Sequence, residues 1–451
     1  MSQKPQNNDL GTAHDSLFKE KVALLRLYYP QFLEIALTDL LLSCDSDFDA
    51  VKGLISGEVP KKRAALTQGS LGVAKARKLQ APASVSSKTS LKNGRQKITL
   101  NTPQDVEHHL APYASLHLNF LPKEVSEPLL AELMEQRHAY KYNQFYLFGN
   151  RCELSHLLGM YSRPEAEYAQ MVYNGLKRSK PALYTENMEK ACVCMEELLN
   201  KKIIPNEPQP QWNVDKRSDS NKESSEKSEE KFRWTSDFCL VNCYEKLQSN
   251  LAWHSDRLSH IGPLNYVALL SLGTTRVFRL RNTYNKNAPT YHIPLPHNSI
   301  LLMKPGCQEE FQHCVGPMSK AIALHETAGS LRFGITARHY PPFFIQNLPK
   351  CRCDLSMILR RSYKNVAIRG QYFWACENIY QNKDCGAFHW ADFDNVSGHY
   401  IAKDTSAILT WIAPEDTEKH EYERKKKETD LKGPDGRPDG RPEGDGVGRS
   451  A

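Results

Sequence analysis

The sequence predicts an α+β protein whose largest domain is an antiparallel double sheet flanked by helices. Two observations support this. Helical spacing of apolar residues comes first in the central block, at Pro122–Gln136, Arg163–Lys177 and Thr185–Lys201. Short runs typical of strands follow, at Phe238–Tyr244, Tyr266–Leu272, Thr275–Leu280 and Ser299–Met303. At 451 residues the chain exceeds one ordinary core, so further modules are expected on either side.

Composition excludes several classes of protein. With 40% hydrophobic and 25% charged residues, the chain is typical of a globular protein that carries disordered parts. It has no apolar run of 18 residues or more, and its first residues are polar, so we expect neither a membrane span nor secretion. Twelve cysteines in an intracellular chain favour metal ligation or buried thiols over disulfides.

Changes in composition divide the chain. An apolar, periodic segment at 14–57 is followed by a basic linker at 58–99, which we expect to be disordered. Residues 61–97 hold ten Lys or Arg and no acid. The central block, 100–346, contains a polar insertion at about 206–231. A cysteine-rich and aromatic module at 349–394 and a charged, Gly- and Pro-rich tail at 414–451 complete the chain, and the tail is also expected to be disordered.

The sharpest chemical pattern is His254-Ser255-Asp256. On extended chain the first and third side chains lie on the same side. A histidine from a later strand would complete a set of two histidines and one carboxylate, which leaves coordination positions open on a non-haem iron(II). His313, in the Phe311-Gln312-His313 unit that follows the turn Lys304-Pro305-Gly306, is the candidate.

The segment Arg332–Arg338 alternates, so that Arg332, Gly334, Thr336 and Arg338 share one face of a strand. Two arginines aimed into a barrel are costly unless anions meet them. A dicarboxylate supplies two such anions, and a guanidinium binds a carboxylate through two parallel hydrogen bonds.

Together these residues resemble the AlkB family of iron(II)- and 2-oxoglutarate-dependent dioxygenases. Its pattern is His-x-Asp, a distant His, and then Arg-x-Asn-x-Thr-x-Arg; an Asn-x-Tyr unit upstream corresponds to Asn242-Cys243-Tyr244. The resemblance covers about residues 112–345 and implies a double-stranded β-helix (jelly-roll) core. It implies iron ligands at His254, Asp256 and His313, and 2-oxoglutarate ligands at Asn242, Tyr244, Arg332 and Arg338.

The resemblance also implies the reaction, which is oxidative removal of alkyl groups from nucleic-acid bases. The chain departs from the family at Gly334, where the family has Asn, and at Arg257-Leu258, where several members have acids. These departures leave the preferred base open. A base must be flipped out or single-stranded to react, and nearby aromatic residues could stack on it, namely Tyr142, Phe145, Tyr146, Phe148 and Trp253. Alkylated DNA, mostly single-stranded, is the expected substrate, which predicts a nuclear location.

The cysteine-rich module contains four thiols, Cys351, Cys353, Cys376 and Cys385, a set that suits a closed structural zinc site. Its sequence resembles the GRF zinc finger, which binds single-stranded DNA. Aromatic and basic residues in it are expected to form a stacking groove: Tyr372, Trp374, Phe388 and Trp390 with Arg360, Arg361, Lys364 and Arg369. As a separate module, it is expected to be removable without loss of chemistry in the central block.

The N-terminal segment Leu24–Pro30, followed by two helical patterns, resembles the CUE ubiquitin-binding domain, a three-helix bundle. The resemblance implies that ubiquitin contacts Tyr28, Tyr29, Pro30, Leu54 and Ile55. The alternative is a helical bundle that packs on the central block or on another helix.

Some residues and alternatives remain outside these motifs. His297, His325 and His339 are expected to be surface or packing residues, and Cys192 and Cys194 to lie on a helix without partners. A demethylase of RNA or protein with the same iron chemistry, and a non-catalytic adaptor for ubiquitin and DNA, are the alternative functions.

Overall fold

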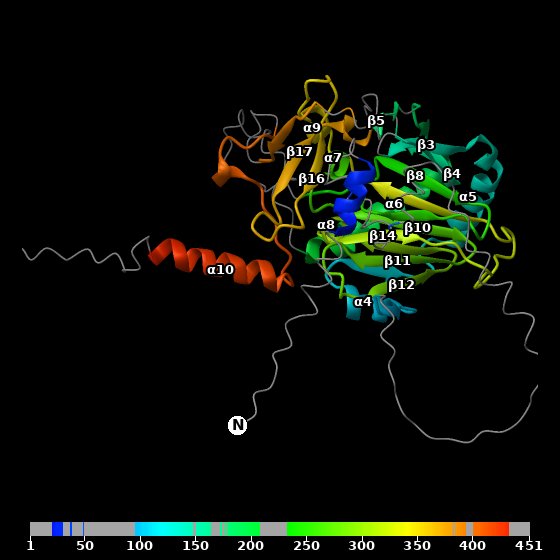
Figure 1. Ribbon diagram of the computed structural model, residues 1–451. Helices are drawn as coiled ribbons and strands as arrows, with labels where there is room; N and C mark the ends of the chain where they lie inside the picture. The colour runs from blue at the N-terminus through cyan, green and yellow to red at the C-terminus, as the bar shows by residue number, and fades with distance from the viewer. Residues whose placement is uncertain are drawn as a thin grey trace, which may run out of the picture.

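The computed structural model describes a β-sandwich flanked by helices, with a smaller three-stranded sheet beside it (Figure 1). The residues that it describes are 20–29, 37, 48, 95–147, 150–163, 172–173, 176–177, 179–207, 232–381, 383, 385–393 and 400–432. Within these ranges, no helix has the length and apolar character needed to cross a lipid bilayer.

Two sheets form the sandwich. The smaller has the order β1-β12-β11-β14-β9, with strands β1 (Lys97–Thr99), β9 (Leu251–His254), β11 (Arg276–Asn282), β12 (Thr290–Leu295) and β14 (Phe311–Val315). The larger has the order β2-β13-β10-β15-β8-β4-β3, with β7 beside β4. Its strands are β2 (Ala114–His117), β3 (Lys141–Leu147), β4 (Asn150–Ser162), β7 (Ala182–Leu183), β8 (Phe238–Tyr244), β10 (Val267–Gly273), β13 (Ser299–Met303) and β15 (Arg332–Arg338). Strands β8, β10, β11, β13 and β15 match the predicted runs, whereas β3, β4 and β12 were not predicted, and the two sheets are consistent with the jelly-roll core that the resemblance implies.

Helices cover the outer face of the larger sheet. Both α5 (Lys123–Gln136) and α6 (Glu186–Glu197) pack there, against alternate residues of β15 such as Phe333 and Ile335. The Thr185 hydroxyl caps α6 by accepting a hydrogen bond from the Met188 N–H. The other helices are short: α4 (Pro103–Leu110), η2 (Arg137–Ala139), η3 (Leu198–Ile203), η4 (Ile204–Asn206), α7 (Leu258–Ile261), α8 (Cys307–Glu310) and α9 (Pro342–Gln346).

The inner face of the larger sheet points into the sandwich. All seven residues of β15 are buried, because helices cover one face of that strand and the second sheet covers the other. Arg332, Gly334, Thr336 and Arg338 lie on the inner face, as their alternation predicts. The sandwich interior is therefore the place where the candidate site residues converge.

One predicted helix is wrong. Arg163–Lys177 was expected to be helical, but β5 (Val172–Tyr173) and β6 (Leu176–Lys177) form an antiparallel pair at its end. In the sequence, the two strands are separated by Asn-Gly, the dipeptide most favoured in two-residue hairpins. The turn preference of this dipeptide outweighs the apolar spacing on which the helix prediction depended.

The C-terminal module is a three-stranded sheet of β16 (Ile358–Arg361), β17 (Tyr372–Ala375) and β18 (Phe388–Trp390), with η6 (Glu377–Gln381) and η8 (Thr405–Ala407). Its pairing extends beyond residue 394, since the Trp411 N–H donates to the Gly370 carbonyl oxygen. Trp374 and Tyr372 belong to the same buried cluster as Tyr244 and Leu258 of the sandwich. This shared core argues against the expectation that the module can be removed without loss of chemistry in the central block.

Two predicted boundaries also change. The basic linker was expected to reach residue 99, but Lys97–Thr99 pairs in parallel with β12. The tail was expected to be disordered from 414, but α10 (Thr417–Lys432) is a helix. Ion pairs four residues apart support α10, for example Arg424 with Glu428.

In the N-terminal module, the structure describes a helix at residues 20–28 and little else. Val22 and Leu25 are buried, while Tyr28 is exposed and its ring contacts Phe48. Pro30, Leu54, Ile55 and the rest of the expected bundle lie outside the described residues. Ubiquitin binding by this module therefore stays a prediction.

Candidate active site

His254, Asp256 and His313 converge where β9 and β14 lie side by side. His254 and His313 are direct partners in the antiparallel register, and their ring centroids are 4.2 Å apart. The potential ligand atoms of the three residues all lie within 4.8 Å of one another. We call these residues the His–Asp–His cluster. The sequence prediction brought together the same three side chains.

The protonation states in this cluster suit a divalent cation. Burial lowers the pKa of His254, and burial with the charge of His254 lowers the pKa of His313 to about 3. Burial alone would raise the pKa of Asp256, but Arg338 together with the neighbouring His313 and His254 outweighs burial, and the net shift is downward. At neutral pH the cluster therefore offers two neutral imidazoles and one carboxylate, the forms that bind metal. The buried Nδ1 of His313 has no hydrogen-bond partner among the described residues.

Hydrogen bonds hold these ligands in place. His254 Nδ1–H donates to the Ala252 carbonyl oxygen at 2.8 Å, which leaves Nε2 for the metal. The backbone N–H of Asp256 donates to Oε1 of Gln308, in α8, at 2.7 Å. Gln308 was not singled out from the sequence, since a lone glutamine in a short helix carries no pattern.

Arg338 lies on Asp256. Its Nε and Nη2 donate to the two carboxylate oxygens, each at 3.0 Å, in a bidentate ion pair. The sequence predicted 2-oxoglutarate as the partner of Arg338, whereas the structure places its guanidinium on an iron-ligand candidate. Arg338 thus fixes the carboxylate and keeps it ionised. Its proposed contact with the co-substrate stays a prediction.

Arg332 has a guanidinium nitrogen that is left to bind a carboxylate. It is 1% exposed, its Nε donates to Ser271 Oγ at 3.2 Å, and its buried Nη2 has no hydrogen-bond partner among the described residues. Its Cζ lies 5.2 Å from the centre of the Tyr244 ring. Burial lowers the pKa of Arg332 to about 10, so the group is still charged at neutral pH. A buried cation with an unsatisfied donor fits a carboxylate ligand.

Gly334 explains how Arg332 takes this position. A Cβ atom on Gly334 would lie 2.2 Å from Nη1 of Arg332, so a larger residue would displace the guanidinium. The departure of this chain from the family's Asn is thus coupled to the conformation of the co-substrate arginine.

Arg276 and His156 complete the pocket and were not found from the sequence. Arg276 is fully buried, with its Cζ 5.2 Å from the centre of the Tyr244 ring, and donates to backbone carbonyl oxygens. His156 stacks on Tyr244, and its Nε2 lies 3.0 Å from Oδ1 of Asn242. Burial lowers the pKa of His156, so it is a neutral group that orients Asn242. Neither residue belongs to a recognisable motif, which is why they were missed.

Comparison with known proteins agrees with this geometry. Residues 114–338 match the family model of the 2OG-Fe(II) oxygenase superfamily. Human alpha-ketoglutarate-dependent dioxygenase alkB homolog 3 is 31% identical over 122 residues, which are 25% of this chain and 40% of the relative. Residues 114–338 are thus similar to the 2OG-Fe(II) oxygenase superfamily, and part of the chain is similar to the AlkB homologues. We call residues 114–338 the oxygenase domain, after the superfamily whose model they match.

Other relatives give the same match over short lengths. The alkB homolog 3 of Bos taurus is 34% identical over 83 residues, or 17% of this chain and 29% of the relative. The chain therefore matches less than half of the length of these relatives. The solved structure of OsALKBH1 is 17% identical, covers 51% of this chain and 99% of its own, and gives a TM-score of 0.35. A second solved structure is a Trichoplax adhaerens prolyl hydroxylase in complex with a hypoxia inducible factor peptide fragment. It is 14% identical, covers 54% of this chain and 90% of its own, and gives a TM-score of 0.33. Scores this low add no weight to the fold assignment.

The side chains present fit both groups that the family uses. Two neutral imidazoles and an ionised carboxylate suit iron(II), and the unsatisfied donor of Arg332 suits a carboxylate of 2-oxoglutarate. His254, Asp256 and His313 would hold the metal, while Arg332, Tyr244 and Asn242 would hold the co-substrate.

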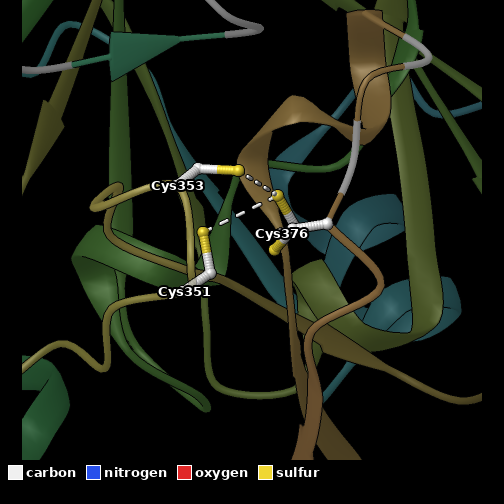
Figure 2. A group of neighbouring side chains, drawn as sticks. Cys351, Cys353 and Cys376 are labelled. Carbon is white, nitrogen blue, oxygen red and sulfur yellow. Dashed lines mark hydrogen bonds between the residues drawn. The ribbon is translucent and has the colours of Figure 1, made fainter.

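The four predicted cysteines also converge, and Figure 2 shows three of them, Cys351, Cys353 and Cys376. The Sγ atoms of Cys351, Cys353, Cys376 and Cys385 all lie within 4.8 Å of one another, and that of Cys376 is 3.7 Å from Cys351 and 4.0 Å from Cys353. We call these residues the four-cysteine cluster. Four thiols from one loop, a strand end and a second loop, at such distances, fit tetrahedral zinc.

The four-cysteine cluster is linked to the His–Asp–His cluster. Glu377, which follows Cys376, accepts two hydrogen bonds of 3.1 Å from Nη1 of Arg257, which follows Asp256. The Arg257 guanidinium also lies over the Tyr380 ring, at 4.8 Å. Arg257 is one of the departures from the family, and its partner is the C-terminal module.

The stacking groove expected in this module needs correction. Tyr372 and Trp374 are fully buried, Arg361 is paired with Glu310, and Arg369 is paired with Asp416. Their predicted contact with nucleic acid is wrong because all four hold the module together or bind it to the rest of the chain.

The opposite face of the small sheet carries another aromatic group. Phe373, Phe388 and Trp390 contact one another, with ring centroids 5.1 to 6.2 Å apart, and Phe388 is 48% exposed. We call these residues the aromatic platform. Arg360 pairs with Phe373 across the strands, and Lys364 is exposed. Phe373 was not singled out from the sequence, although the alternation of β17 places it opposite Tyr372 and Trp374.

The aromatic residues that were expected to stack on the base differ in their exposure. Tyr142 is exposed and Phe145 is half-buried, whereas the side chain of Tyr146 and all of Phe148 lie outside the described residues. The Trp253 ring is covered by Arg281, whose Cζ lies 4.3 Å from the ring centre. Tyr142 is thus the candidate with the most accessible ring.

One expectation about buried residues is also corrected. Cys192 was expected to have no partner, but its Sγ lies 3.8 Å from that of Cys239 and accepts a hydrogen bond from Ser236. His339 packs as expected, with Nδ1 at 2.8 Å from Oδ2 of Asp237.

Proposed function

We propose that this protein removes alkyl groups oxidatively from damaged bases of single-stranded DNA. The observation that carries the proposal is the aromatic platform, which is held rigidly on the oxygenase domain through a shared core and the Arg257–Glu377 ion pair. Exposed rings stack on bases of any sequence, and neighbouring Arg and Lys side chains neutralise phosphates.

The roles of the protein residues follow from the site. When bound, iron(II) and 2-oxoglutarate would supply the activation of dioxygen: one oxygen atom hydroxylates an N-alkyl carbon of the base, the other oxidises 2-oxoglutarate to succinate and carbon dioxide, and the alkyl group then leaves as an aldehyde. Arg332, backed by Tyr244 and Ser271, holds the co-substrate carboxylate. Arg338 keeps Asp256 ionised and oriented, and Gln308 fixes its backbone.

A direct assay tests the proposal. Full-length protein with iron(II) and 2-oxoglutarate is incubated with alkylated DNA and RNA oligonucleotides of the same sequence, and restored bases are measured by mass spectrometry. Restored bases in DNA support the proposal. Restoration in RNA alone would favour the alternative, an RNA demethylase, and loss of 2-oxoglutarate without any restored base would favour a protein substrate.

The platform is tested by binding. We expect Phe388→Ala to weaken binding of a fluorescent single-stranded oligonucleotide by about 1–3 kcal/mol, the usual worth of one stacked base. Leu355→Ala, at a half-buried apolar residue of the same module outside the platform, serves as the control. Equal binding by Phe388→Ala and the native protein would remove the nucleic-acid role of the platform.

We further propose that the N-terminal module binds ubiquitin and recruits the enzyme, and that the enzyme acts in the nucleus. Two variants, Tyr29→Ala and Leu54→Ala with Ile55→Ala, should weaken ubiquitin binding by the full-length chain and leave activity on a short oligonucleotide unchanged. Unchanged ubiquitin binding in both variants would exclude the apolar patch that the CUE resemblance implies.

A further inference from the structure

The outer face of the smaller sheet carries cations and no acid. The inner residues of its strands belong to the buried core or pack against it, among them Ile98, Leu280 and Tyr291. The residues that alternate with them are therefore on the outer face. The strands β1, β9, β11, β12 and β14 contain no Asp or Glu at any position.

Three residues of this outer face lie next to one another, which are Lys97 in β1, His292 in β12 and Arg279 in β11. His292 is the direct partner of Arg279 in the antiparallel register and of Thr99 in the parallel register. Lys97 is two residues from Thr99 and so lies on the same face. Lys97 is exposed, and the other two are half-buried. We call Lys97, His292 and Arg279 the basic triplet.

The fold leaves the cations of the basic triplet without an acid. The Nε of Arg279 is buried and has no hydrogen-bond partner among the described residues. The guanidinium lies against Gly316, where an added Cβ would be 2.5 Å from Cζ, so the charge is held close to the sheet. Neither Lys97 nor Arg279 forms an ion pair within the part of the chain that the structure describes. An anion from outside the chain would stabilise a cation in this position.

His292 responds to the same uncompensated charge. Burial, followed by the charges of Arg279 and Lys97, lowers its pKa to about 4, so the ring is neutral at neutral pH. A nearby acid would raise this pKa, and none among the described residues does so. The surroundings of His292 are therefore positively charged, and its neutral ring still has an N–H to donate.

We propose that the basic triplet binds phosphate groups of the single strand on which the enzyme acts, an inference that rests on the function proposed above. A phosphodiester is an anion that accepts hydrogen bonds from Arg and Lys whatever the base, and such contacts position a nucleic acid on a protein. A single strand carries one of these anions at every nucleotide, so neighbouring cations on a sheet can contact consecutive phosphates. The absence of acids from all five strands means that these strands do not repel such a chain.

The basic triplet is connected with the active site along the same face. Trp253, whose ring lies under Arg281, directly precedes His254 in β9. Arg281 lies two residues from Arg279, and its Nε and Nη2 donate to Oε1 of Gln312. A single strand that leaves the His–Asp–His cluster over β9 would therefore meet these side chains first and the basic triplet next.

The salt dependence of binding tests the proposal. Binding of an undamaged fluorescent single-stranded oligonucleotide is measured at several salt concentrations with the native full-length protein and its variants. We expect Lys97→Gln and Arg279→Gln each to make the slope of log affinity against log salt shallower by about 0.7, the value for one phosphate neutralised on a single strand. Because Lys97 is exposed, its variant keeps the test valid if Arg279→Gln fails to fold.

Two controls separate this surface from other cations and from stacking. Lys123→Gln removes an exposed cation from α5, which covers the larger sheet, and should keep the native slope. Phe388→Ala removes a ring of the aromatic platform and should lower the affinity at every salt concentration without changing the slope, because no phosphate contact is lost.

Native slopes in both Lys97→Gln and Arg279→Gln would overturn the inference, whether or not the enzyme restores alkylated bases. Shallower slopes in these variants, with no restored base in the assay described above, would support the phosphate contacts and exclude only the reaction. Native slopes together with weaker retention of the two variants on immobilised polyglutamate would also overturn the inference, since the face would then bind an acidic protein.

Discussion

The His–Asp–His cluster and the four-cysteine cluster differ in how much of their geometry depends on a metal. In the first, Ala252, Gln308 and Arg338 already orient His254 and Asp256 through hydrogen bonds. In the second, the Cys376 Sγ lies 3.7 Å and 4.0 Å from those of Cys351 and Cys353, the Ala387 backbone N–H donates to Cys385, and a thiol is itself a weak hydrogen-bond donor. An open catalytic site has to keep its shape when the metal is absent, whereas a closed structural site can obtain its shape from the metal.

The largest expected effect is on the open site. His254→Ala removes one of three ligands and should abolish conversion of 2-oxoglutarate to succinate, while the unfolding temperature changes little. Asp256→Ala should also abolish turnover, but it leaves the buried Arg338 unpaired and should cost about 3–5 kcal/mol of stability. Succinate formation and thermal unfolding measure both. Turnover of His254→Ala at the native rate would exclude the iron assignment.

At the four-cysteine cluster, we expect a substitution to lower stability as well as activity. We expect Cys376→Ser, or zinc removal by a chelator, to lower the unfolding temperature, weaken single-strand binding and also reduce turnover, because the module shares a core with the oxygenase domain. Cys194→Ser, at a half-buried cysteine outside the cluster, is the matched control. If zinc-free protein retained full stability and turnover, the two clusters would be independent.

The Arg332→Ala variant should change the affinity for 2-oxoglutarate without changing the stability of the protein. Arg332→Ala should weaken 2-oxoglutarate binding by about 1.5–3 kcal/mol, or roughly ten- to more than a hundredfold. Removal of a buried cation with an unsatisfied donor should not lower the stability of the ligand-free protein. Titration of 2-oxoglutarate and thermal unfolding without it measure the two quantities. An unchanged affinity would show that another group holds the carboxylate.

Gly334→Ala should have a smaller effect in the same direction, because the new Cβ displaces the Arg332 guanidinium without removing it. We expect the KM for 2-oxoglutarate to rise and kcat to change less. Gly329→Ala is an informative control, since a Cβ there meets no atom within 4 Å, although its φ of +57° makes the substitution strained. A fall in kcat without a change in KM would mean that Gly334 acts on the reaction step.

The smallest effect is expected at the link between the clusters. Glu377→Gln weakens a pair in which the side chains of Arg257 and Glu377 are 14% and 3% exposed, so turnover should fall a few-fold. Asp354→Asn, which weakens the exposed Lys350–Asp354 pair, should have no effect because such pairs contribute about 0–1 kcal/mol. If the two variants behaved alike, the buried pair would not couple the module to the active site.

The sequence predicted the elements whose pattern is local. The alternation of β15 and the His-x-Asp spacing were sufficient to place Arg332, Asp256 and His254, and the four cysteines were identified by type alone. It did not reveal partners that depend on the tertiary fold. Arg338 could be assigned to a strand face but not to Asp256, and His156 meets Asn242 only because β4 and β8 are neighbours in the larger sheet.

The expectation that the C-terminal module is separable from the central block had a related weakness. Strand β16 reads Ile-Leu-Arg-Arg and β17 reads Tyr-Phe-Trp-Ala, and nothing in runs this short shows which surface their apolar residues cover. In the structure, Leu359 donates its N–H to Ser259 Oγ, and Arg361 pairs with Glu310. These contacts join residues that are about a hundred and about fifty positions apart in the sequence, so a local pattern cannot predict them.

The shared core also has a consequence for biosynthesis. Domains generally fold from the N-terminus as the chain is synthesised, at about 5–20 residues per second. Here Leu258 and Tyr244, beside the His–Asp–His cluster, belong to a core that includes Phe393 and Tyr400. The nascent oxygenase domain therefore emerges from the ribosome with part of its apolar surface uncovered, and a message truncated after residue 346 would encode a protein that chaperones retain.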